Sequence, residues 1–157
     1  MPAPPVIGVV SDTHAYYEPQ LDALFAGVVR IVHAGDFGTL DVLERLRLLA
    51  PLTVVCGNVD RPYFLEQFPL ETEVEVAGLR ILVCHIGESL MGRHDPVAEG
   101  HGLVVNGHSH RAAAKWRDGT LFLNPGSAGR ARFGKPRTAA LVTVRDGVAE
   151  PQIVSLD

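Results

Sequence analysis

The apolar positions in the first third of the chain form short runs that alternate with helical spacings. Residues 6–10, 30–32 and 52–56 are short runs rich in β-branched side chains, as in strands buried on both faces. Between the runs, large apolar residues recur every three or four positions, which predicts a helix after Pro19 and a second helix after Thr39, its possible N-cap. This order predicts a parallel sheet flanked by helices.

The second half of the chain has a different pattern, in which dipeptide turn signals separate pairs of apolar stretches. The dipeptides are Ala77-Gly78, Asp118-Gly119 and Asp146-Gly147. An Asp-Gly pair between alternating apolar residues is a strong hairpin signal. We therefore expect hairpins within 73–84, 112–123 and 138–154, and a mostly antiparallel second half. Nothing resembles an interdomain linker, so the sequence predicts one α/β domain over residues 1–157 with mixed sheets.

Composition narrows the classes of protein to consider. The 18 acidic residues outnumber the 14 basic ones, and a net charge of −4 makes stable nucleic-acid binding unlikely to be the function of this chain. No apolar run approaches the ~20 residues of a membrane span, and the first five residues have no signal-peptide character. We expect a cytoplasmic protein that does not bind membranes, with Cys56 and Cys84 as reduced core thiols.

The candidate chemistry lies where the apolar runs end. Each of five runs is followed closely by side chains that can bind a metal ion, and the seven candidate ligands are Asp12, His14, Asp36, Asn58, His85, His108 and His110. In open α/β sheets, sites form at the carboxyl ends of the strands. Imidazole mixed with carboxylate and amide oxygens suits manganese, iron, nickel, cobalt or zinc better than calcium or magnesium.

The number of ligands indicates two metal ions. In extended backbone, the paired histidines His108 and His110 point to the same side, so they can serve one ion or one ion each. Seven ligands exceed what one catalytic ion needs, because such an ion keeps an open position. Two ions that share one ligand fit better. A carboxylate has two oxygens and can bridge, and Asp36 is the natural bridging residue.

These motifs, in order, resemble the calcineurin-like metallophosphoesterase superfamily. The resemblance rests on Asp12-x-His14, Gly35-Asp36, Gly57-Asn58-x-Asp60, His85 and Gly107-His108-x-His110. The short chain and Asn124-Pro125-Gly126-Ser127 resemble its small bacterial and archaeal phosphodiesterase branch. The resemblance implies two packed β-sheets flanked by helices. It also implies one ion held by Asp12, His14, Asp36 and His110, and another held by Asp36, Asn58, His85 and His108.

The expected activity is hydrolysis of a small phosphoester, first of all a phosphodiester. Two ions, with manganese as the first expectation, would activate a bridging hydroxide that attacks phosphorus. Asp36, Asn58 and His108 are the expected catalytic groups.

Two alternatives to this activity stay open. One is a non-catalytic interaction scaffold on the same fold, as in the retromer subunit that resembles the family. The other is a nuclease or nucleotidase acting on short or cyclic nucleotides. A homo-oligomer is compatible with the sequence.

Five features qualify this interpretation. Many superfamily members carry a histidine where this chain has Val59, which has no proton to donate, and Ile86 follows His85 where relatives often have glycine. The basic loop, residues 129–137, offers Arg130, Arg132 and Arg137 as substrate-binding candidates. His33 could form a hydrogen bond to Asp60 or to a metal ligand, or it could be a strand histidine whose hydrogen bonds serve only the fold. Asp60 is expected to orient a neighbouring group.

Overall fold

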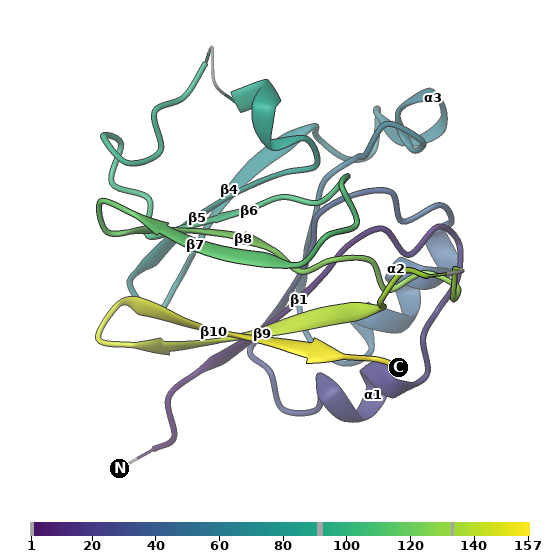
Figure 1. Ribbon diagram of the computed structural model, residues 1–157, viewed down its shortest axis with the longest axis horizontal. Helices are drawn as coiled ribbons and strands as arrows, with labels where there is room; N and C mark the ends of the chain where they lie inside the picture. Colours follow the sequence, from purple (N-terminus) through teal and green to yellow (C-terminus); the bar gives the residue numbers. More distant parts are fainter. Residues whose placement is uncertain (1, 91–92, 133) are drawn as a thin grey trace.

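Two five-stranded sheets pack face to face in the computed structural model, which describes residues 2–90, 93–132 and 134–157 (Figure 1). The first sheet has the order β10-β9-β1-β2-β3, with β1 (Val6–Val10), β2 (Arg30–His33), β3 (Leu52–Val54), β9 (Thr138–Arg145) and β10 (Val148–Ser155). The second has the order β4-β5-β6-β8-β7, with β4 (Glu71–Val76), β5 (Leu79–Cys84), β6 (Leu103–Val105), β7 (Ala113–Arg117) and β8 (Thr120–Asn124). The predicted fold of two packed mixed sheets is confirmed.

All three hairpins form, and the strand pairs of the second half are mostly antiparallel, as the sequence predicts. β4–β5, β7–β8 and β9–β10 pair antiparallel, and the turn residues Ala77, Asp118 and Asp146 have positive φ angles. However, β5–β6 and β6–β8 pair in parallel. The sequence did not predict these two parallel pairs, because β6 lies between two hairpins and is reached through long connections that the turn signals do not reveal. The second sheet therefore has three parallel strands at its centre, whereas the parallel strands of the first sheet, β1, β2 and β3, extend to its edge.

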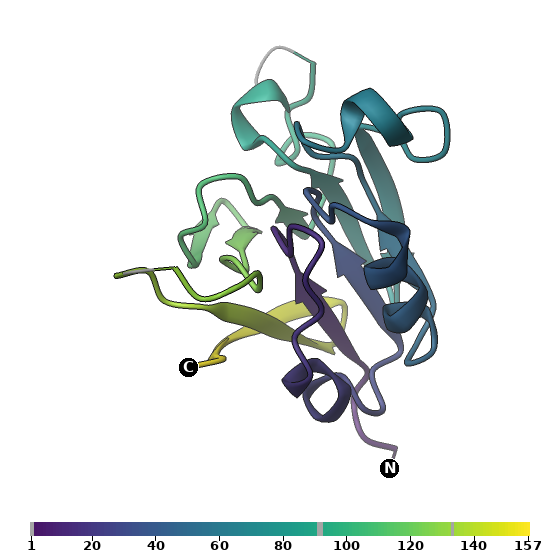
Figure 2. The same ribbon diagram turned by 90° about the vertical axis from the view of Figure 1, so that its right-hand side faces the viewer.

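Two of the helices cover the outer face of the first sheet. The helices of the described chain are α1 (Gln20–Leu24), α2 (Leu40–Arg47), α3 (Arg61–Phe64) and a 3-10 turn, η1 (Gly87–Leu90). Apolar side chains of α1 and α2 pack with Val10 and Ile31 on the outer face of the first sheet (Figure 2). The helix predicted after Pro19 is short: α1 ends at Leu24, and Gly27 beyond it has a left-handed φ of 80°. Thr39 occupies the N-cap position of α2 without a side-chain capping hydrogen bond.

The main core lies between the two sheets. Ile7, Val9 and Val32 of the first sheet pack in one buried cluster with residues of the second sheet, such as Val83 and Val105. Both cysteines are buried and unpaired. The outer face of the second sheet carries only a small apolar cluster, Leu82, Cys84 and Val104 with Phe122 against it, and no α-helix of the described chain packs there. No described helix is both long and apolar enough to cross a membrane.

Candidate metal centre

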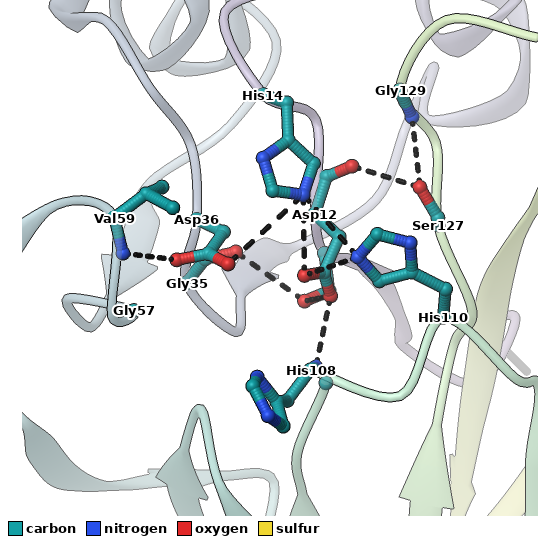
Figure 3. A network of polar contacts seen from close by, with 12 residues as sticks. Asp12, His14, Gly35, Asp36, Gly57, Val59, His108, His110, Ser127 and Gly129 are labelled. Carbon is teal, nitrogen blue, oxygen red and sulfur yellow. Dashed lines mark hydrogen bonds and ion pairs between the residues drawn. The ribbon is translucent and has the colours of Figure 1, made fainter.

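The seven candidate ligands lie beyond the carboxyl ends of the parallel strands of both sheets, and Figure 3 shows Asp12, His14, Asp36, His108 and His110 close together. The first sheet contributes four of them, which follow β1, β2 and β3: Asp12, His14, Asp36 and Asn58. The second sheet contributes the other three, which follow β5 and β6: His85, His108 and His110. Because parallel strands carry their ends to one edge, five separate segments of the chain deliver polar side chains to one place.

Among the residues that the structure describes, two groups have ligand atoms within 4.8 Å of one another. They are Asp12 with His14 and His110, and Asp36 with His85 and His108. The paired histidines therefore fall in different groups. Asp36 Oδ2 lies 3.1 Å from His85 Nε2 and 4.0 Å from His14 Nε2, so Asp36 stands between the groups. This spacing suits two ions that share one carboxylate.

Asn58 lies beside the second group. Its Oδ1 is 3.2 Å from Nδ1 of His108, and the side chain is exposed. A carbonyl oxygen next to a ring nitrogen can share one ion with it.

Asp12 is oriented so that one carboxylate oxygen is held and the other is free for a ligand. Oδ2 accepts hydrogen bonds from the Ser11 hydroxyl (2.6 Å) and the backbone N–H of His108 (3.1 Å). Oδ1 is buried with no hydrogen-bond partner among the described residues, and lies 3.2 Å from His110 Nε2. Burial favours the neutral acid, but nearby histidines and Ser11 outweigh it and lower the pKa of Asp12. An ionised carboxylate with a bare oxygen fits a cation.

His85 shows the same arrangement on the second sheet. Its Nδ1 lies 2.8 Å from the backbone oxygen of Ala34 and donates to it, because a carbonyl can only accept. Nε2 is buried without a hydrogen-bond partner in the described chain. Burial lowers the pKa of His85, but the carboxylates of Asp36 and Asp12 outweigh it and raise the pKa. A histidine fixed through one nitrogen, in a place that attracts positive charge, is a typical metal ligand.

The remaining histidines and the donor set also fit metal ions. His14 Nε2 and His110 Nε2 are 3.3 Å apart. Burial lowers the pKa of His110, and the positive charges of His14, Arg132 and Lys135 lower it further, although Asp12 opposes them. This keeps the ring neutral, the form that binds a metal. Four imidazoles, two carboxylates and one amide oxygen match first-row transition metals.

The backbone at the ligands is held in a conformation that most residues avoid. Left-handed φ angles occur at five of the seven ligands, namely Asp12 (55°), His14 (48°), Asp36 (57°), His108 (72°) and His110 (62°). Asp and His tolerate this region better than most side chains, but it still costs on the order of 1–3 kcal/mol per residue. Such strain persists only where the surrounding structure enforces it, and it is concentrated at functional sites.

Asp60 ties two ligand loops together. Its carboxylate accepts hydrogen bonds from the backbone N–H groups of Gly57 (2.9 Å), Phe37 (3.2 Å) and Gly38 (3.0 Å). The first group precedes Asn58 and the other two follow Asp36, so Asp60 fixes both ligands through their backbones. The expectation that Asp60 orients a neighbouring group agrees with these contacts.

Two motif glycines allow the ligand loops to approach closely, a role that we did not infer from the sequence. A Cβ at Gly57 would lie 2.0 Å from Asp36 Oδ1. A Cβ at Gly107 would lie 2.1 Å from Ser11 Oγ and 2.6 Å from Asp12 Oδ2. The signal was present, because each glycine directly precedes a ligand motif.

His33 is a hydrogen-bonded strand histidine. Its Nδ1 accepts the backbone N–H of Gly35 at 3.1 Å, so the neutral ring carries its proton on Nε2, which donates to Thr13 Oγ1 at 3.0 Å. Thr13 in turn donates to the backbone oxygen of Phe37 at 3.2 Å. Burial lowers the pKa of His33 to about 3. Of the two interpretations, this geometry supports a strand histidine whose two ring nitrogens are both hydrogen-bonded within the fold. These bonds connect the loops that follow β1 and β2.

The basic loop divides into two parts. Arg137 is largely buried, forms an ion pair with Glu18, and donates from Nε to the backbone oxygen of Gly129 at 2.8 Å. Its guanidinium is thus occupied within the fold, which argues against substrate binding. Arg130 is exposed and lies over the Tyr16 ring, 4.9 Å from the centroid. Arg132 is exposed, and its charge acts on His110.

Comparisons with known proteins agree with this site. Residues 6–147 match the family model of the calcineurin-like phosphoesterase superfamily domain. A probable metallophosphoesterase of Methanothermobacter thermautotrophicus is 33% identical over 147 residues, covering 87% of this chain and 84% of the relative.

Solved structures share the fold at lower identity. A novel archaeal phosphodiesterase has a TM-score of 0.75 at 22% identity, covering 96% of this chain and 99% of that one. Zinc-complexed Vps29 from Entamoeba histolytica has a TM-score of 0.70 at 20% identity, covering 97% and 99%. The matched family model spans most of the chain and includes every ligand, so this protein belongs to the calcineurin-like phosphoesterase superfamily.

Proposed function

We propose that this protein is a metal-dependent phosphoesterase that hydrolyses phosphodiesters with two divalent transition-metal ions, manganese first among them. The observation that carries the proposal is a pair of buried ligand atoms that make no hydrogen bond within the described chain, Asp12 Oδ1 and His85 Nε2, each beside another candidate ligand in two adjoining groups. Leaving such atoms bare is costly unless something binds them. The likeness to an archaeal phosphodiesterase supports the choice of diesters.

In this proposal, Asp12, His14 and His110 hold one ion, and Asn58, His85 and His108 hold the other, with Asp36 shared between them. Ions at such a site supply positive charge for the phosphoryl oxygens and lower the pKa of a water nucleophile. The chain sets the geometry of the site through Asp60, His33 and the closely packed glycines.

Two further residues near the site would affect substrate binding and the departure of the leaving group. Arg132, whose charge acts on His110, is placed to attract an anionic phosphoester toward the ligands. Val59 is part-exposed, and its backbone N–H donates to Asp36 Oδ1 at 3.0 Å. Because its side chain has no proton to give, the enzyme depends on leaving groups that depart without general acid help.

A non-catalytic scaffold is the second candidate function. It is favoured by the fold that the chain shares with Vps29, a vacuolar sorting protein. The complete ligand set is the opposing observation, because an interaction surface does not require seven converging ligands. We therefore rank hydrolysis first.

The test uses metal-stripped protein with bis(p-nitrophenyl) phosphate and p-nitrophenyl phosphate, and with Mn²⁺, Ni²⁺, Zn²⁺ and Mg²⁺ added in turn. We expect transition metals to restore hydrolysis, and the diester to be preferred. Asp36→Asn should lose bound metal and activity. Asp41→Asn, the same change at an exposed carboxylate of α2, should retain both. Metal binding without hydrolysis under every condition would favour the scaffold.

A further inference from the structure

A pocket opens beside the metal centre, on the outer face of the second sheet. Its volume is about 650 Å³, within the range of about 300–1,000 Å³ that is usual for small-molecule sites. Val104 and Phe122, on adjacent strands, form its floor, and Ile86 and Pro96 contribute to its walls. This is the face that no α-helix of the described chain covers.

The pocket is continuous with the candidate metal centre. His108 lines the pocket and also belongs to the ligand group of Asp36 and His85. A phosphoester whose phosphoryl group lies at the ligands therefore has room for one of its organic groups in the pocket. The arrangement places the phosphate and its substituent in adjoining but chemically different surroundings.

The outer wall of the pocket is fixed by ion pairs. His94, which lines the pocket, lies 3.2 Å from a carboxylate oxygen of Glu71 on β4 and 3.0 Å from one of Glu99. The contact with Glu71 joins the 93–99 segment to β4, and the contact with Glu99 holds the segment together internally. A wall held in this way forms a pocket before any ligand arrives, which lowers the ordering cost of binding.

The lining indicates which organic group fits. The guanidinium of Arg117 lies over the Phe122 ring, 4.6 Å from its centroid, so the pocket contains a planar stack. Guanidinium and aromatic faces both stack with planar rings. Glu88 and Asp95 also line the pocket. With them, the lining has no excess of positive charge despite Arg117, so it offers little attraction to a second phosphate and suits a neutral ring.

We propose that this pocket binds a neutral planar aromatic group of the substrate, so that the protein acts on phosphoesters that carry an aryl group or a nucleobase. The inference rests on the proposed function, because the phosphate has to occupy the metal centre. Phe122 and Arg117 would select the aromatic group, while the seven ligands act on the phosphate alone.

The experiment compares phosphate monoesters that have the same headgroup and different substituents. Binding of methyl phosphate, phenyl phosphate, ribose 5-phosphate and cytidine 5′-monophosphate to the manganese-loaded protein is measured by calorimetry. We expect phenyl phosphate to bind about tenfold more tightly than methyl phosphate, a ratio that corresponds to about 1.4 kcal/mol. Tighter binding of cytidine 5′-monophosphate than of ribose 5-phosphate would identify a nucleobase as the group that the pocket binds. Tighter binding of phenyl phosphate alone would identify a simple aryl group.

Two variants and a matched control test the residues. Phe122→Leu keeps an apolar side chain but removes the ring, and Arg117→Gln leaves the core unchanged; each should reduce the aromatic preference to about threefold or less. Trp116→Leu removes an exposed aromatic ring that does not line the pocket, and should keep the full preference. Circular dichroism and thermal midpoints establish that the variants are folded.

The outcomes separate this inference from the proposed function. Equal binding of all four monoesters by a protein that hydrolyses bis(p-nitrophenyl) phosphate would overturn the inference and leave the function standing. An aromatic preference that persists in both Phe122→Leu and Arg117→Gln would also overturn it. An aromatic preference without hydrolysis would refute the function and support the pocket as a binding site.

Discussion

Replacing Asp60 with asparagine is expected to destabilise the fold and to loosen two metal-ligand loops at once. One oxygen of the carboxylate accepts N–H groups from Gly57 and Phe37, and the other accepts the N–H of Gly38. An asparagine side chain has one oxygen, so its NH₂ group must face at least one of these donors. The change is nearly isosteric, and any effect therefore reports hydrogen bonding rather than lost volume.

The magnitude follows from the best orientation of the asparagine. If its oxygen takes the position that serves Gly57 and Phe37, two bonds are kept without the charge, at a loss of roughly 1 kcal/mol each. Gly38 is only half-buried, so water can satisfy part of its N–H, and the added cost is about 1 kcal/mol. The expected loss in the free energy of unfolding is therefore about 2–4 kcal/mol.

Denaturant unfolding of the metal-free protein, followed by circular dichroism, measures this loss from the midpoint and slope. The measurement is made at pH 8, because burial raises the pKa of Asp60 and the carboxyl must be ionised to accept all three hydrogen bonds. Asp146→Asn, in an exposed turn with a φ of 52°, is the matched control and should stay within ~0.5 kcal/mol of the wild type.

Metal affinity provides the functional readout for the same variant. Groups that orient metal ligands typically change affinity by roughly 10–100-fold when removed, and we expect Asp60→Asn to fall in that range. A variant with unaltered stability and unaltered metal affinity would refute the idea that Asp60 fixes the loops of Asp36 and Asn58.

Three further predictions concern the basic loop, His33 and Val59. Arg137→Gln should lower the free energy of unfolding by about 3 kcal/mol without changing KM, because it leaves buried Glu18 without its ion-pair partner. Arg132→Gln should raise KM without changing stability, and the opposite result for the two variants would show that Arg137 binds substrate and Arg132 stabilises the fold. The pKa of His33 is about 3 in the fold against 6.5 in the unfolded chain, so the free energy of unfolding should fall by up to about 1.4 kcal/mol per pH unit as the pH is lowered from 6.5 toward 3. His33→Gln should remove this contribution to the pH dependence, and equal pH dependence in the variant and the wild type would contradict the prediction. Because Val59 cannot donate a proton, kcat for aryl diesters should depend steeply on the pKa of the leaving group, and a flat dependence would indicate a donor elsewhere.

The proximity of the candidate ligands could be predicted from the sequence because each follows an apolar run, and parallel strands place their ends at one edge. His85 and His110 could be identified in this way although they lie far apart in the chain. The topology was harder to predict. The three residues of β6 pair in parallel with strands of two different hairpins, and nothing in Leu103–Val105 encodes those partners.

Contacts between distant segments were also beyond the sequence pattern. Arg137 resembled its neighbours Arg130 and Arg132, but its partner Glu18 lies 119 positions away. The pocket beside His108 forms where residues 86–88 and 94–96 face β6 and β8, so no single stretch of sequence indicates it. Local patterns report local chemistry, whereas the pairing of an arginine or the shape of a cavity depends on the whole fold.

The distribution of the ligands over the two sheets has a mechanical consequence. Each ligand group combines side chains from both sheets: Asp12 and His14 with His110 in one, and Asp36 with His85 and His108 in the other. Ions held in this way would cross-link the sheets at one edge, so that the sheets could not slide past each other there. Loading with metal would then stiffen the sandwich from the site outward, and amide hydrogen exchange at the facing strand ends would slow in step with occupancy.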